Sequence, residues 1–234
     1  MTDPTPTLPA PRQPTLPSHR ERYGLLLGAI IVAFAIQGIA EPSKWEQIVV
    51  AVLLSATLLL ALWAGDTKPR VMRPAIVIGV VVVLASISEA SNGNIDGGAT
   101  RIANALLVGL APPAIIIGVV RSLRARQAVT LEAVFGVLCV YLLLGMFFAS
   151  VYGTIDRFGG NPFFAGGQPA TVARCLYFSF ASLTTAGYGD LTARTNLGHT
   201  LSVSEALLGQ IYLVTVVSLI VANLGRSRPA PKVE

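Results

Sequence analysis

Long apolar runs recur along the whole chain, and this pattern limits the possible folds more than any other feature of the sequence. Hydrophobic residues make up 53% of the 234 residues and charged residues 12%, whereas about 25% of residues are charged in ordinary soluble domains. Most runs approach the ~20 residues that a helix needs to cross the hydrocarbon layer of a membrane. The sequence therefore predicts an all-α membrane protein with six transmembrane helices. They are expected at residues 23–40, 47–64, 74–88, 102–120, 131–152 and 197–224.

The distribution of basic residues predicts the orientation, because cytoplasmic segments of membrane proteins collect Lys and Arg. If both termini are cytoplasmic, twelve of the 17 Lys and Arg residues lie in inner segments and five in outer ones. We therefore expect a multi-pass protein of the cell membrane with cytoplasmic N- and C-termini. The first run could instead be a cleaved signal sequence, since small residues occur at 38–40, but its apolar core exceeds the usual ~7–15 residues. The basic residues form short scattered groups, so no nucleic-acid partner is expected.

The segment between the last two apolar runs is different in kind. Residues 171–183 are apolar and aromatic but only about a dozen in number, too few to cross a bilayer. They follow Pro169 and lead into the sequence SLTTAGYGD at 182–190. Irregular backbone at membrane depth persists only where protein buries it or where water or ions replace its hydrogen bonds. The pattern predicts a re-entrant half-helix, after which the chain turns back through irregular backbone that is buried by protein or lined by water or ions.

The glycine spacing after this half-helix suggests what the turn does. If the carbonyls of Thr185, Ala186, Gly187 and Tyr188 point at a common axis, the backbone must alternate between right- and left-handed regions. Glycine enters the left-handed region without steric cost, and Gly187 and Gly189 occupy alternate positions. A ring of such carbonyls can replace the hydration shell of a cation.

The residues TTAGYGD closely resemble the signature of the potassium-channel family, and residues 174–190 (RCLYFSFASLTTAGYGD) resemble its pore helix and selectivity filter. The resemblance extends over residues 131–224. It implies a tetrameric pore-loop channel, a homotetramer, in which K⁺ is the permeating ligand at Thr185, Ala186, Gly187 and Tyr188, with no cofactor and no enzymatic step. The TTAGYGD segment, and hence the implied filter, consists of Thr184, Thr185, Ala186, Gly187, Tyr188, Gly189 and Asp190.

Three positions depart from the pattern of that family. Ala186 stands where Val or Ile is usual, and the two missing methyl groups forfeit about 1.6 kcal/mol of burial per subunit, which predicts a looser filter. Tyr177 and Phe178 replace a common Trp pair, so Asp190 is expected to find another donor, such as Tyr177 of a neighbouring subunit. Ala181 stands where some bacterial channels carry a buried glutamate.

The last apolar run resembles the inner, pore-lining helix of a simple two-span bacterial channel. Gly209 falls at the hinge glycine, and the positions on the cavity side are spaced three to four residues apart, on one helical face. Gly209 could equally be a helix-packing glycine, and the amide of Gln210 could bond to another helix. The residues expected to line the pore or form its gate are Gly209, Gln210, Leu213, Val217 and Val221.

Two ionisable residues of the same run are candidates for regulation. Glu205 lies inside a predicted span, where an ionisable group is by default a functional hypothesis. It could brace the pore helix through Ser182 or a backbone N–H, or it could sense protons. His199, near the outer end, is either an ordinary interfacial residue or a proton sensor.

The predicted fourth span carries no Lys or Arg between residues 102 and 120. Voltage sensors need several charges there, because each charge moved contributes only ~2.3 kcal/mol per 100 mV. Six spans with a pore between the last two resemble the architecture of the voltage-gated channel superfamily. The first four spans are therefore expected to resemble a voltage sensor in architecture but, without the charges, not to sense voltage. The basic residues that follow are expected to meet anionic lipid headgroups, or to form a regulatory lipid site. They are Arg121, Arg124 and Arg126.

These features predict five parts of the chain and one main function. The function is a K⁺-selective channel that conducts passively; the alternatives are a weakly selective cation channel and a non-conducting membrane sensor or accessory subunit. Cys139 and Cys175 lie in apolar runs and are expected to be buried packing residues. The parts are a Pro-rich disordered tail (1–22), a four-helix domain (23–120), an interfacial linker (121–130), a pore domain (131–225) and a short tail (226–234).

Overall fold

Helices make up nearly all of the regular structure. The computed structural model describes residues 19–39, 44–65, 69–91, 98–126 and 131–224, and within these ranges it contains helices and a single isolated β-bridge but no strand. The helices are α1 (His19–Ile39), α2 (Lys44–Ala64), α3 (Pro69–Ser91), α4 (Gly98–Arg126), α5 (Leu131–Phe158), the short 3-10 helix η1 (Ala165–Gly167), α6 (Val172–Leu183) and α7 (Asn196–Leu224).

Every predicted span falls on a helix. Within the described chain, three helical segments are both long and apolar enough to cross a membrane: Glu21–Ile39, Arg70–Glu89 and Ala133–Phe158. Shorter apolar stretches lie at Ile48–Ala64 and Ile102–Ile117. The all-α prediction is confirmed for the described residues, and a multi-pass membrane protein is supported, while the count of six spans stays a prediction.

Two predicted boundaries fall inside helices. α1 begins at His19, within the predicted tail, and its charged first turn includes Glu21, whose carboxylate favours the positive end of the helix dipole. α4 continues to Arg126, so the first six residues of the predicted linker are helical. Arg, Leu and Ala are good helix formers, and positive charges stabilise a helix C-terminus. Apolar periodicity shows where a helix is buried but not where its solvated ends stop.

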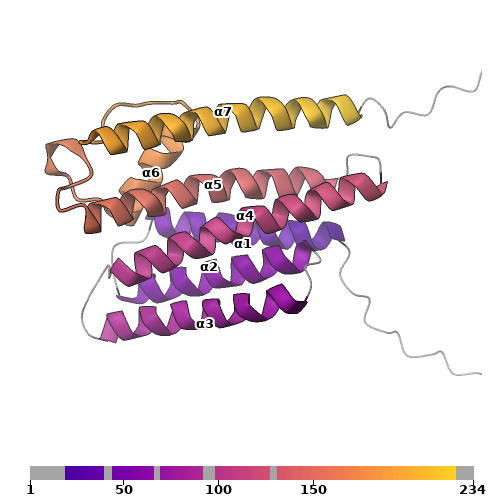
Figure 1. Ribbon diagram of the computed structural model, residues 1–234, viewed down its shortest axis with the longest axis horizontal. Coiled ribbons are helices and arrows are strands. Elements are labelled where there is room, and N and C mark those ends of the chain that lie inside the picture. Colours follow the sequence, from indigo (N-terminus) through magenta and orange to yellow (C-terminus); the bar gives the residue numbers. More distant parts are fainter. Residues whose placement is uncertain (1–18, 40–43, 66–68, 92–97, 127–130, 225–234) are drawn as a thin grey trace, which may run out of the picture.

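Helix α5 occupies the centre of the molecule. It contacts α1 and α4 on one side and α6 and α7 on the other, while α3 contacts α2 and α4. In Figure 1, α3 and α7 accordingly lie at opposite edges of the set of long helices. The first four helices thus reach the remainder of the chain mainly through α5.

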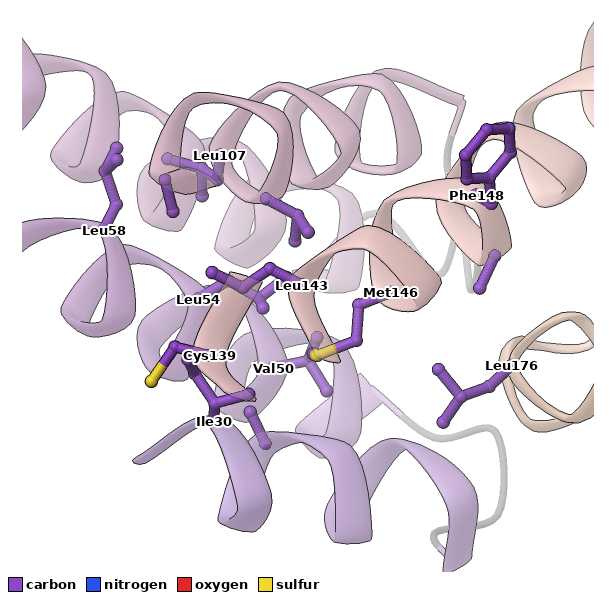
Figure 2. Packing of buried hydrophobic residues seen from close by; sticks show 14 of the residues in the cluster. Ile30, Val50, Leu54, Leu58, Leu107, Cys139, Leu143, Met146, Phe148 and Leu176 are labelled. Carbon is purple, nitrogen blue, oxygen red and sulfur yellow. The ribbon is translucent and has the colours of Figure 1, made fainter. Parts of the chain in front are cut away.

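The core lies where α5 meets the first four helices. Figure 2 shows Leu54 of α2, Leu107 of α4 and Leu143 and Met146 of α5 in one cluster, and all four side chains are almost completely buried. Burying an aliphatic side chain of this size contributes about 1.5–3 kcal/mol. Aliphatic packing therefore holds α5 against α1 and α4.

Small residues let the helices approach closely at two points on α5 and α4. A Cβ built on Gly145 would lie 2.6 Å from the ring of Phe180, so the absence of a side chain makes room for this residue of α6. A Cβ on Gly109 would lie 3.1 Å from the ring of Phe147. Glycines at helix contacts commonly serve this purpose in membranes, and Gly145 thereby sets the distance between α5 and α6.

Candidate functional site

Helix α6 ends where the TTAGYGD segment begins. The Thr171 hydroxyl caps its N-terminus by accepting a hydrogen bond from the Arg174 N–H at 3.3 Å. Its 12 residues rise only about 18 Å, well short of the ~30 Å hydrocarbon thickness. α6 contacts α1, α5 and α7, so three helices hold it in place although it is too short to cross a membrane.

The backbone of the TTAGYGD segment alternates in handedness. Thr185, Gly187 and Gly189 have φ values of 56°, 55° and 80°, so every second residue lies in the left-handed region. The glycines adopt the conformation expected from their spacing. Thr185 is a finding that the sequence did not predict, because a β-branched residue rarely takes a positive φ. Backbone strain of this kind concentrates at functional sites.

The hydrogen bonds of this segment leave its carbonyl groups unpaired. The N–H of Thr185 donates to the Ser182 carbonyl at 2.9 Å, and the N–H of Gly187 donates to the Ala181 carbonyl at 3.1 Å. Within the described residues, no hydrogen bond uses the carbonyl oxygens of residues 185–188. The amides are therefore anchored to the end of α6, while the oxygens remain available to coordinate a cation.

Two tyrosines brace the outer end of the segment. The Tyr177 hydroxyl donates to Asp190 Oδ1 at 3.1 Å, and the rings of Tyr177 and Tyr188 stack with centroids 5.7 Å apart. Tyr177 is thus the partner expected for Asp190, but it comes from the same chain and not from a neighbour. The reason is topological, since the TTAGYGD segment runs back alongside the helix that leads into it.

A buried carboxylate joins the three helices α5, α6 and α7. Glu205 of α7 is 0% exposed, and its Oε2 accepts a hydrogen bond from the Tyr152 hydroxyl of α5 at 2.6 Å. Its Oε1 accepts from the Ser179 hydroxyl of α6, which also lies 2.7 Å from the Gly145 carbonyl. The expected partners, Ser182 or a backbone N–H, were wrong. Ser179 lies about one helical turn before Ser182 on α6, and α7 places the Glu205 carboxylate beside Ser179.

The comparison with known proteins matches this part of the chain. Residues 136–226 match a family model described as ion channel. This match supports the conclusion that the protein is an ion channel. It includes most of α5, all of α6, the TTAGYGD segment and α7, but none of the first four helices. No curated protein matches the chain.

The predicted pore-lining residues occupy two environments within the channel region. Gly209 is buried, and a Cβ at this position would collide with the carbonyl of Leu183, which is the close packing that the alternative interpretation expects. The Gln210 Nε2 donates to the Thr185 hydroxyl at 3.0 Å, and Leu213 is partly exposed on α7. The hinge and cavity roles stay predictions. Val217 and Val221 lie outside the residues whose side chains the structure describes.

His199 holds the loop that follows the TTAGYGD segment. Its Nε2 lies 2.7 Å from the Ala193 carbonyl. Ala193 also forms an isolated bridge with Phe164, and the Ala165 N–H donates to the Thr192 carbonyl at 2.9 Å. Through residues 192 and 193, these contacts connect the start of α7 to the loop before α6. A proton-sensing role for His199 stays a prediction.

Other candidates from the sequence fall away from this region. Neither Cys139 nor Cys175 is in a disulfide, and both are buried, as expected. Among the described residues, no three His, Cys, Asp or Glu side chains gather as metal ligands would. The side chains of three basic residues at the end of α4 lie outside the described part of the chain. They are Arg121, Arg124 and Arg126.

Proposed function

We propose that the protein is a potassium channel in which carbonyls of the TTAGYGD segment coordinate dehydrated K⁺. The observation that carries the proposal is the division of roles along this backbone. Amides of Thr185 and Gly187 are tied to α6, while the carbonyls of residues 185–188 have no partner in the described chain. In water-poor surroundings an unpaired carbonyl is costly, and a cation stripped of its hydration shell supplies the missing interaction.

One chain contributes one strand of such a filter, so we propose a homotetramer around a central axis. The resemblance of TTAGYGD to potassium channels implies four copies. α7 offers a suitable surface, because Val203, Leu207, Ile211 and Val214 are exposed apolar residues along its length. In a tetramer, these side chains would pack against neighbouring subunits and be removed from water and lipid. The same assembly would close the ring of the filter.

We further propose that six helices cross the cell membrane, with both termini in the cytoplasm and residues 131–225 forming the pore. The first four helices then form a scaffold that is not voltage-sensing, since residues 102–120 carry no charge. Arg121, Arg124 and Arg126 would lie at the cytoplasmic surface, where anionic lipids are favourable partners. These arginines continue α4 as a helix, which suits a helix end at a membrane surface.

A weakly selective cation channel is a second candidate, and one observation favours it. Ala186 lines a cavity of about 390 Å³ together with Phe180 and Ala181 of α6 and Phe34 of α1. A segment with open space behind it can widen, and a wider ring of carbonyls discriminates less between K⁺ and Na⁺. The cavity thus bears on the degree of selectivity and leaves the conduction path unchanged.

Bi-ionic flux in proteoliposomes tests these functions together. We expect K⁺ to pass more readily than Na⁺ through the purified full-length chain. Equal passage of both ions would favour the weakly selective channel, and passage of neither would favour a non-conducting sensor or accessory subunit. Chemical cross-linking in the same liposomes should give a ladder that ends at four subunits. A ladder that ends at two would contradict the tetramer.

A further inference from the structure

A small cavity lies at the junction between the first four helices and the pore region. It has a volume of about 50 Å³ and is bounded by Gln37 of α1, Asn104 of α4, Ser150 of α5 and Cys175 of α6, with Val50 of α2 beside them. Five helices therefore meet at one internal space. The aliphatic cluster that joins the same helices contains Val50, as Figure 2 shows.

Two polar groups at this cavity lack hydrogen-bond partners. Gln37 is only 5% exposed, and its Nε2 has no partner among the described residues. The Oδ1 of Asn104 is also buried without a partner there. A buried polar group left unpaired is destabilising and rare in native proteins. One hydrogen-bond donor, Gln37 Nε2, and one acceptor, Asn104 Oδ1, thus border the same cavity without a partner among the described residues.

The lining of the cavity limits what can occupy it. Among the described residues that border it, none carries a charged side chain, so an ion would find no counter-charge from them. The occupant must accept a hydrogen bond from Gln37 and donate one to Asn104. A water molecule does both, and it needs about 10–15 Å³ of such a cavity, so the space admits a few waters and little else.

We propose that this cavity is a bound-water site that bridges Gln37 of α1 and Asn104 of α4, at the place where the first four helices pack against α5 and α6. The bridging water completes the hydrogen bonds that the helices leave open. It also places a polar link between α1 and α4 directly beside Ser150 of α5 and Cys175 of α6, which border the same space. The proposal does not depend on which ion the pore conducts.

Hydroxyl-radical footprinting tests the site directly, because radicals generated from bound water label neighbouring side chains that bulk solvent does not reach. The chain offers a matched pair of thiols for this purpose. Cys175 borders the cavity and is 2% exposed, whereas Cys139 is 0% exposed and lies elsewhere in the core. In the full-length protein in nanodiscs, we expect Cys175 to be oxidised at least several-fold faster than Cys139. Equal rates for the two thiols would overturn the proposal.

A double-mutant cycle tests whether the two amides share the water. Gln37→Leu and Asn104→Leu each leave the other amide and the water with fewer partners, so each should lower Tm by a few degrees. The double variant removes both amides and dries the cavity, so its loss should be smaller than the sum of the two. It should also bring the labelling of Cys175 down to the level of Cys139.

A cavity-filling variant separates bridging water from an empty space. Val50→Ile adds one methylene group to a side chain that borders the cavity. If water is bound, the added group should lower Tm in the wild-type chain and raise it in the Gln37→Leu/Asn104→Leu background. A higher Tm in both backgrounds would show that the cavity is empty. Additive effects of the two leucine substitutions would show that the amides do not share a ligand.

Discussion

Buried hydroxyl groups behave differently in the two halves of this molecule. In the first four helices, Thr57 and Ser86 donate to the carbonyl four residues earlier in the same helix, at 2.8 and 2.9 Å. Ser55 does the same at 2.7 Å, and it reaches a carbonyl of the neighbouring helix, that of Gly79, only at 3.4 Å. In α5 and α6, Tyr152 and Ser179 donate instead to Glu205 of α7. Tyr212 of α7 likewise donates to a carbonyl of α5 at 2.6 Å.

The two kinds of hydrogen bond constrain neighbouring helices to different degrees. An intrahelical bond satisfies a polar group but gives no information about neighbouring helices. A bond between helices is directional, so it fixes rotation and height as well as proximity. The first four helices are therefore positioned mainly by the shape of aliphatic side chains. Helices α5 to α7 are held in addition by a few interhelical hydrogen bonds, whose loss we expect to affect the TTAGYGD segment.

The largest expected effect comes from Gly187→Ala. Gly187 and Gly166 both have positive φ values, 55° and 75°, and neither has an atom within 4 Å of a built Cβ. Each alanine should thus cost about 1–2 kcal/mol for a left-handed residue, but only Gly187 carries a carbonyl of the proposed filter. We expect Gly187→Ala to abolish K⁺ flux and Gly166→Ala to retain it. Normal flux through Gly187→Ala would falsify the filter assignment.

The next largest effect is expected from Glu205→Ala. This change leaves the Tyr152 hydroxyl buried without its acceptor, and Ser179 keeps only the Gly145 carbonyl as an acceptor. The free energy of unfolding should fall by about 2–4 kcal/mol. Glu205→Gln keeps the size of the side chain and one acceptor oxygen, so its loss should be roughly half as large. Denaturant titration of the solubilised protein measures both. Equal losses for the two variants would mean that the hydrogen bonds do not position the helices.

Serine-to-alanine changes in the two halves provide the sharpest form of the comparison. Ser179 and Ser86 are both 0% exposed, so the same atom is deleted from equally buried sites. Ser179→Ala should destabilise by about 1–3 kcal/mol, because Glu205 loses a donor. Ser86→Ala should stay within about 0.5 kcal/mol, since only an intrahelical bond is lost. Thermal melting of both variants decides, and similar shifts would remove the distinction between the halves.

A smaller effect is expected from Tyr177→Phe, which removes the hydrogen bond to Asp190. Tyr177 is 41% exposed, so water replaces part of the lost interaction and the loss of stability should be small. Tyr188→Phe is the matched control, because it deletes the hydroxyl from the other ring of the same stacked pair. Melting should show a larger loss for Tyr177→Phe. The reverse order would indicate that stacking alone holds Asp190 in place.

The smallest effect is expected from Ala186→Val, which fills open space without altering any carbonyl. The cavity of about 390 Å³ behind Ala186 admits two more methyl groups, so the protein should stay stable and its K⁺/Na⁺ selectivity should rise slightly. Ala173→Val adds the same atoms to the same cavity, away from the TTAGYGD segment, and should leave selectivity unchanged. Bi-ionic reversal potentials measure this. Lower melting temperatures for Ala186→Val would show that neighbouring subunits already fill the space.

The sequence predicted those parts of the molecule that depend on local pattern. Helix positions follow from apolar runs, and the positive φ values at Gly187 and Gly189 follow from glycine spacing. The partners of Glu205 could not be predicted, because Tyr152 and Ser179 lie 53 and 26 residues away along the chain. Nothing local distinguishes Ser179 from Ser182 as a donor.

Thr185 shows a second limit of reasoning from sequence. The intrinsic preference of a β-branched residue argues against its φ of 56°. The bond from its N–H to the Ser182 carbonyl holds it there, and that bond exists only once α6 has formed and turned. The helix ends at His19 and Arg126 were missed for a simpler reason, because solvated helical turns carry no apolar signal.

The contact between Gly209 and Leu183 has a mechanical consequence. Because a side chain at position 209 would collide with the Leu183 carbonyl, the backbone of α7 lies directly against the end of α6. The Tyr141 hydroxyl reaches the same carbonyl from α5 at 3.4 Å. No flexible side chain lies between the two backbones to absorb a displacement. We therefore expect α7 and the TTAGYGD segment to move together. A sideways shift at Gly209 would displace the backbone of Leu183, two residues before Thr185, and the hydrogen bond from Gln210 to Thr185 would transmit a movement of the next residue of α7.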